Sequence, residues 1–125
     1  MDNQSQPKFN TWWDEKNNIL IAEFFGDQEE KDAELFANKV RELANAHGGR
    51  IRILTDGRKG GKSSTMARKI YYDLYESGVI EKSALFGLGF VQRVIASFIH
   101  YRKSQTRAKF FETEEEALKW LIEDK

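Results

Sequence analysis

The sequence contains no cysteine, a single proline and only two histidines among its 125 residues. Without cysteine the chain can form neither disulfide bonds nor thiolate metal sites, as is common in reducing compartments. His47 and His100 do not show the spacing of metal ligands, so we expect no metal and no cofactor. The N-terminal residues lack an apolar core, unlike a signal peptide, and no apolar stretch is long enough to cross a bilayer. We therefore expect a soluble, cytoplasmic protein.

The composition is that of a folded chain, with 40% hydrophobic and 13% aromatic residues. Its length suits one hydrophobic core, so we expect a flexible polar tail over residues 1–8 and a single domain over residues 9–125. The net charge is zero, but residues 50–110 carry 13 Lys and Arg against 4 Asp and Glu. Folding could neutralise this excess against the acidic ends of the chain, or leave a basic patch that attracts an anion.

The hydrophobic pattern predicts an α/β fold with a mixed β-sheet. An N-terminal antiparallel hairpin is followed by parallel strands, and about four helices flank the sheet. Capping-box patterns at Asp27 with Glu30, and at Thr113 with Glu116, predict the starts of the first and last helices. Strands are expected at residues 9–13, 19–25, 51–56, 84–89 and 108–111, and helices at 27–47, 66–77, 91–107 and from 113 onward.

The stretch TDGRKGGKSST (residues 55–65) lies between a predicted strand and a predicted helix and resembles a phosphate-binding loop. The Walker A spacing would require glycine where Asp56 stands, so we do not expect a P-loop NTPase. Two interpretations remain: an anion bound by basic side chains and free amides at the helix start, or a solvated turn with a serine cap. The residues concerned are Arg58, Lys59, Lys62, Ser63 and Ser64.

A second glycine-rich stretch, GLGF (residues 87–90), ends a predicted strand and opens the next helix. Gly87 and Gly89 could let a ligand approach the backbone, with Arg93 one turn into the helix, or could serve tight helix–strand packing. If strands 51–56 and 84–89 are parallel neighbours, this loop and the 57–65 loop open onto one crevice.

Other functional signals are weak. The stretch FIHYRKSQTRAK could form a basic helix at a membrane surface, or a core helix with solvated cations. No nucleic-acid motif accompanies it, so we expect no nucleic-acid binding, and no base is placed to activate a serine, so we expect no enzyme. Trp12, Trp13 and Trp120 suit a core or an interface, and the aromatic first strand is compatible with a homodimer.

Four segments together resemble the SpoIIAA-like proteins, small relatives of the STAS domains whose fold is shared with CRAL-TRIO lipid-binding domains. The segments are W…DEKNNILIAEFFGD, ILTDGRKGGKSSTMARK, ALFGLGFVQRVIASFI and FFETEEEALKWL, and the resemblance covers nearly all of the chain after residue 8. In the anti-sigma-factor antagonists of this group, a partner kinase phosphorylates a serine that starts the helix after the third strand. Ser63 and Ser64 are the matching positions, although Gly-Lys precedes them and Thr65 follows.

The resemblance implies a non-catalytic regulatory or ligand-binding module, with an anion or phosphorylated group near residues 57–65. The alternative is a CRAL-TRIO-like carrier of an apolar or lipid ligand between the sheet and the predicted 91–107 helix. A nucleotide-dependent enzyme is the third interpretation. The expected partners are therefore a protein, or an anionic or lipid small molecule.

Overall fold

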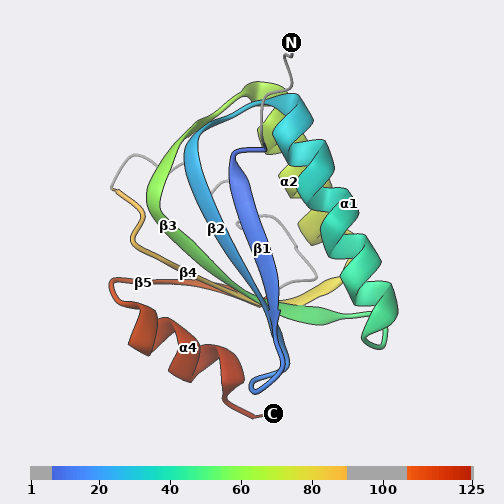
Figure 1. Cartoon of the computed structure of the whole chain (residues 1–125), viewed down its shortest axis with the longest axis vertical. Helices are drawn as coiled ribbons and strands as arrows, with labels where there is room; N and C mark the ends of the chain where they lie inside the picture. Colours follow the sequence, from blue (N-terminus) through green and yellow to red (C-terminus); the bar gives the residue numbers. More distant parts are fainter. Residues whose placement is uncertain (1–6, 90–106, 125) are drawn as a thin grey trace.

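A computed structural model describes residues 7–89 and 107–124 of the chain (Figure 1). Five strands form one sheet in the order β1-β2-β3-β4-β5, with β1 and β2 antiparallel and all other neighbours parallel. This confirms the predicted mixed sheet. The elements are β1 (Phe9–Asp14), β2 (Ile19–Gln28), α1 (Glu30–Ala46), β3 (Ile51–Ser63), α2 (Thr65–Glu76), β4 (Ile80–Phe86), β5 (Arg107–Phe111) and α4 (Glu114–Ile122).

Helices cover both faces of the sheet. Figure 1 shows α1 and α2 on one side and α4 on the other, and the core is divided accordingly. Along β2, Leu20 and Ala22 face α1 and α2, whereas Ile19 faces α4, as the two-residue period of a strand requires. Three helices lie within the described residues, where no helix is long and apolar enough to span a membrane. The helix expected at 91–107 falls outside the described residues.

Helix α1 begins later than the sequence suggested. The predicted capping box of Asp27 and Glu30 is wrong, because β2 continues to Gln28 and Glu29 is the N-cap residue. Asp32 closes the observed box by accepting the Glu29 amide proton at 2.9 Å. The other oxygen of this carboxylate accepts the Lys8 amide proton at 3.2 Å and thereby ties the chain before β1 to α1.

The expected 57–65 loop is largely a strand, which corrects the prediction of a turn. β3 runs on to Ser63 and stays paired with β2, through Phe25 opposite Lys59 and Gln28 opposite Ser63. Two register shifts each give β3 one residue more than β2, so the segment is a bulged, bent extension of the sheet. Glycine and lysine are typical of turns, but pairing with β2 outweighs that local preference.

The glycines of this segment serve strand contacts. A Cβ at Gly61 would overlap the carboxylate of Asp27 and lie 2.9 Å from the carbonyl carbon of Gly26 on β2. At Gly57 a Cβ would overlap the side chain of Leu88. Only glycine allows backbone and side chains to approach this closely, so the spacing that resembled a phosphate loop reflects packing within the protein.

Candidate functional site

The candidate residues lie along the second half of β3, after the end of β4 and at the start of α2. β3 and β4 are parallel neighbours, as predicted, with Asp56 opposite Phe86. Gly87 follows β4 directly and has a φ of 79°, which favours glycine. A Cβ at Gly87 would overlap the Arg58 side chain and lie 3.1 Å from its amide nitrogen. The structure thus brings Arg58 and Gly87 together, and in the described part of the chain Arg58 occupies the space beside this glycine.

Arg58 forms a tight local ion pair with Asp56. Its Nη2 donates to Oδ2 at 2.7 Å and its Nε to Oδ1 at 3.0 Å, while the guanidinium lies 5.3 Å from the centre of the Phe86 ring. Hydrogen bonding from Arg58, opposed by burial and aided by the charge of Lys59, lowers the pKa of Asp56. The positive charge of Arg58 is therefore already compensated, although 63% of the side chain is exposed. An anion at this place would have to compete with Asp56 for the guanidinium.

Ser63 and Ser64 lie at the junction between β3 and α2. Ser64 is the N-cap residue, and its Oγ accepts the Ala67 amide proton at 3.1 Å, as the capping interpretation predicted. The Ser63 carbonyl accepts a hydrogen bond from Arg68 Nη1 at 2.6 Å, and Arg68 Nη2 donates to Thr65 Oγ1 at 3.3 Å. Arg68 thus adds a cation to this junction, and the sequence signal for it was a basic residue in the first turn after the serines.

A buried glutamine fixes the position of this junction. The Gln28 carbonyl accepts the Ser64 amide proton at 2.9 Å. Its side-chain oxygen accepts a hydrogen bond from the Tyr71 hydroxyl at 3.2 Å, and burial raises the pKa of that tyrosine. Gln28 therefore connects the end of β2 with two turns of α2. Sequence reasoning missed it because Gln28 was expected in the first turn of a helix starting at Asp27, where polar residues are typically exposed to solvent.

The remaining candidates are dispersed. Lys59 and Lys62 are exposed on the bulged part of β3, and the Lys62 amide donates to Asp27 Oδ1 at 2.9 Å. Gly89 is exposed, and Arg93 lies outside the described residues. Two groups result. Arg58 lies with Asp56, Lys59 and Gly87 where β4 ends beside β3, and Lys62 lies with the two serines at the start of α2.

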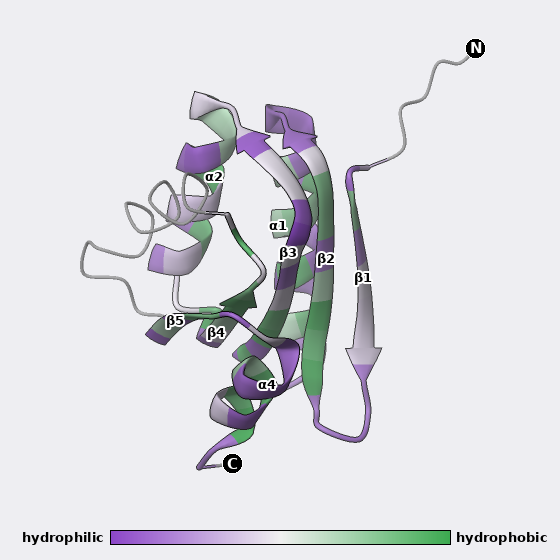
Figure 2. Ribbon diagram, turned by 90° about the vertical axis from the view of Figure 1, so that its left-hand side faces the viewer, coloured by the Kyte–Doolittle hydropathy of each residue, from purple (hydrophilic) through white to green (hydrophobic). Residues whose placement is uncertain are grey.

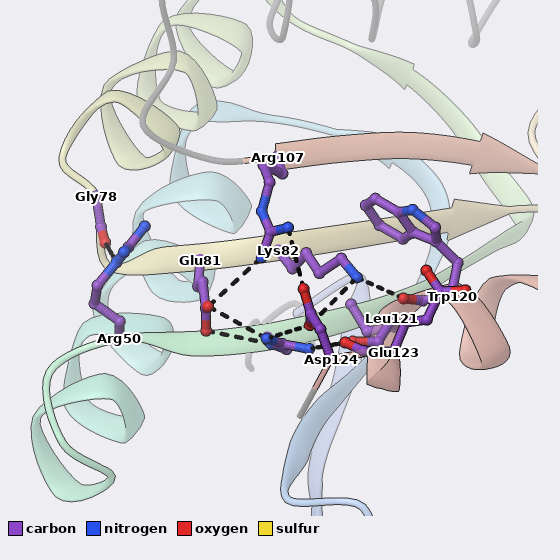
Figure 3. Close-up of polar contacts among 10 residues, drawn as sticks. Arg50, Gly78, Glu81, Lys82, Arg107, Trp120, Leu121, Glu123 and Asp124 are labelled. Atoms are coloured by element: carbon purple, nitrogen blue, oxygen red, sulfur yellow. Dashed lines mark hydrogen bonds and ion pairs between the residues drawn. The ribbon is translucent and has the colours of Figure 1, made fainter.

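A second polar cluster, which the sequence did not reveal, lies at the other end of the parallel strands (Figure 3). Arg52 of β3 is only 6% exposed. Its Nη1 donates to the carbonyl oxygens of Leu121 at 2.7 Å and Glu123 at 3.0 Å, and its Nη2 donates to Asp124 Oδ1 at 3.0 Å. Carbonyl groups at the end of a helix lack partners within the helix, and here a buried guanidinium satisfies them. We call Arg52, Glu81, Lys82, Arg107 and Asp124 the Arg52 cluster.

Lys82 supplies the second buried cation of the Arg52 cluster. Its Nζ donates to the Trp120 carbonyl at 2.6 Å and lies 4.2 Å from the centre of the indole ring. Burial lowers the pKa of this ammonium. A register shift between the Ile51–Ile80 and Arg52–Lys82 pairs makes Glu81 an extra residue. The bulge lets Glu81 meet Arg52 at 3.2 Å, and this hydrogen bond lowers the pKa of the carboxylate.

These features define an α/β domain with a mixed sheet. The Arg52 cluster lies at one end of the parallel strands, and the candidate site lies toward the other end. The SpoIIAA-like family model matches residues 19–122, and the chain belongs to the SpoIIAA-like family. This agrees with the resemblance noted in the sequence.

Two solved structures have a similar fold. One is an uncharacterised protein of the DUF3478 family with a SpoIIAA-like fold from Shewanella loihica PV-4, at 21% identity and a TM-score of 0.69, covering 97% of this chain and 99% of the other. The other is the anti-sigma factor antagonist SpoIIAA in its unphosphorylated form, at 13% identity and a TM-score of 0.63, covering 92% and 98%. No curated protein matches the chain.

Proposed function

We propose that this protein is a non-catalytic regulatory module that binds a partner through the start of α2. The family supports this assignment, since one protein of similar fold is an anti-sigma factor antagonist. The chemistry agrees with it. Ser64 Oγ is engaged by the helix backbone, and His47 stacks on Trp13 at the opposite end of α1. In the described part of the chain, the Ser64 hydroxyl therefore serves as a helix cap.

We also propose that an anionic or phosphorylated group binds at the N-terminus of α2, because of the charges around that end of the helix. Among the described helices, α1 and α4 have carboxylates in their first turns, whereas α2 has none. No acidic side chain in the first turn of α2 therefore offsets the positive end of its dipole. The exposed Lys62 and the Arg68 guanidinium add positive charge at the same end. The anion would be a phosphoryl group on Ser64 or Ser63, or one presented by a partner. We leave Arg58 out of this smaller site because it pairs with Asp56.

Phosphate titration followed by amide NMR tests the anion site. With inorganic phosphate as the probe, we expect the Thr65 and Met66 amide signals to shift at millimolar concentrations, because these amides lie at the start of the helix. Lys62→Glu should abolish the shifts. Lys69→Glu is the matched control, since Lys69 is exposed in the second turn of α2, away from its N-terminus, and pairs with Asp73. Absence of shifts in the wild type, or equal loss in both variants, would reject the site.

Partner binding has a separate test. A photo-crosslinking residue at Met66, which is 46% exposed beside the serines, should capture one defined protein in cells that express the chain naturally. The same residue at Leu35, 41% exposed on α1, should not. Identical patterns from both positions would argue against a partner surface on α2. The carrier of an apolar ligand remains the alternative. It depends on the helix expected after residue 90, which lies outside the described residues, and a co-purifying acyl species in native mass spectrometry would favour it.

A further inference from the structure

The two edge strands of the sheet are protected very differently. β5 carries the exposed cations Arg107 and Lys109, which discourage another strand from pairing with it. β1 has no charged residue from Phe9 to Trp13, no proline and no register shift against β2. Trp12, in the middle of this strand, is 48% exposed. A regular, uncharged, aromatic edge is the kind of strand that recruits another.

The backbone of β1 shows which groups are available for pairing. The Phe25 amide donates to the Lys8 carbonyl at 3.0 Å, so the backbone at Lys8 points toward β2. Because backbone groups alternate along a strand, those of Asn10 and Trp12 also point toward β2, and those of Phe9, Thr11 and Trp13 point outward. In the described part of the chain no strand lies on the outer side of β1. Figure 2 shows β1 at this margin of the sheet.

We propose that a second copy of this chain pairs its β1 with this edge, antiparallel and with Thr11 opposite the partner's Thr11. This register places outward-facing backbones opposite each other, Phe9 against the partner's Trp13, so that each pair exchanges two hydrogen bonds. It also places Lys8 opposite the partner's Asp14, and symmetry creates this oppositely charged pair twice.

Charge and aromatic contacts favour this register over its neighbours. A slip of two residues in one direction would place Lys8 opposite the partner's Lys16, which is unfavourable. A slip in the other direction would place Trp13 opposite the partner's Pro7, which has no amide proton to donate. In the proposed register Trp12 lies diagonal to the partner's Trp12, within reach of an aromatic contact that covers both exposed rings.

Sedimentation velocity over roughly a hundredfold range of concentration tests the dimer by mass action. We expect the wild type to move from monomer to dimer. Thr11→Pro should raise the dissociation constant at least about tenfold, since the amide that it removes faces away from β2 and proline is tolerated at such positions. Trp12→Lys should act in the same direction by placing a cation on the edge. Met66→Lys is the matched control, an equally exposed apolar residue on α2, and should leave the dimer unchanged.

Amide hydrogen exchange identifies the edge itself. In the dimer the Phe9, Thr11 and Trp13 amides should become protected as the concentration rises, whereas in Thr11→Pro the remaining two should exchange rapidly. A wild type that stays monomeric would overturn the proposal, as would a dimer unaffected by Thr11→Pro and Trp12→Lys. Protection independent of concentration would show that another segment of the same chain pairs with β1. Thr11→Pro should keep the phosphate shifts at Thr65, so this proposal and the proposed function can fail separately.

Discussion

Arg52 and Arg58 lie six residues apart on β3 and both pair with carboxylates, but they do so in opposite ways. Arg52 is buried and reaches acceptors on and after α4, as far as 72 residues away in the sequence. Arg58 is mostly exposed and pairs with a residue two positions earlier on its own strand. The buried arginine connects separate elements through hydrogen bonds and ion pairs, whereas the exposed arginine forms its ion pair within its own strand.

This difference separates structural from functional positions. A buried cation that loses its partners leaves unpaired charges and carbonyls in a region without water, so the fold depends on it. An exposed ion pair contributes little to stability because water and salt replace it readily. The sheet therefore tolerates change at the end that carries the candidate site far better than at the end that carries the Arg52 cluster.

The largest loss in the free energy of unfolding is expected for Arg52→Ala. It removes the donor to Leu121, Glu123 and Asp124, and a buried hydrogen-bonding group left without its partner costs about 1–3 kcal/mol. Urea unfolding monitored by circular dichroism measures this change. Arg50→Ala is the control, since Arg50 is exposed and its Nε donates to the Gly78 carbonyl. Equal losses in the two variants would contradict the distinction drawn between buried and exposed arginines.

Acidification should lower the stability of the fold by an intermediate amount, mainly through protonation of Glu81. Hydrogen bonding to Arg52 lowers the pKa values of Glu81 and Asp124 below their ordinary values of 4.5 and 3.8. The unfolded chain then takes up protons before the folded one, so stability is present above about pH 4.5 and falls as the pH drops through the lower folded values. Glu81→Gln should be less stable at neutral pH but lose less on acidification. Thermal midpoints of the wild type and of Glu81→Gln, measured from pH 7 to pH 2.5, test this difference. Parallel curves for the two would show that Glu81 does not cause the loss of stability in acid.

The smallest change in stability is expected for Arg58→Ala. Because the pair with Asp56 is exposed, the thermal midpoint should move by about 2 °C or less. The Asp56 carboxyl should nevertheless report the change, since its main pKa-lowering partner is removed and its pKa should rise in an NMR titration. Phosphate-induced shifts at Thr65 should persist. If they disappear, Arg58 belongs to the anion site after all.

Much of the fold was predictable because its signals are local. Two segments rich in aromatic and β-branched residues, separated by a polar turn, located the β1–β2 hairpin. Thr113 caps α4 by accepting the Glu116 amide proton at 3.2 Å, as its pattern predicted. The extension of β3 was not predictable, since the bulges that join Lys59 and Ser63 to β2 depend on a partner strand. Composition alone favours a turn there, and the tertiary pairing overrides it.

The candidate site was only partly predictable for the same reason. Ser64 as a helix cap follows from local chemistry, but the capture of Arg58 by Asp56 and its approach to Gly87 require the folded sheet. One available signal was overlooked. Arg52 stands inside the apolar run IRIL, and a charge within a strand covered on both faces must find a buried partner. Sequence alone could not identify that partner, because it comes from α4 and the residues that follow it.

The long separation within the Arg52 cluster also bears on the order in which the chain can fold during synthesis. β3 and β4 leave the ribosome well before α4, so Arg52 and Lys82 must remain hydrated until residues 120–124 arrive. The α1–α2 side of the sheet needs no such late residue and can close earlier. A chain stopped before α4 would keep Arg52 and Lys82 solvated on the face of the sheet that α4 covers. This side of the core can therefore pack only after the last helix has been translated.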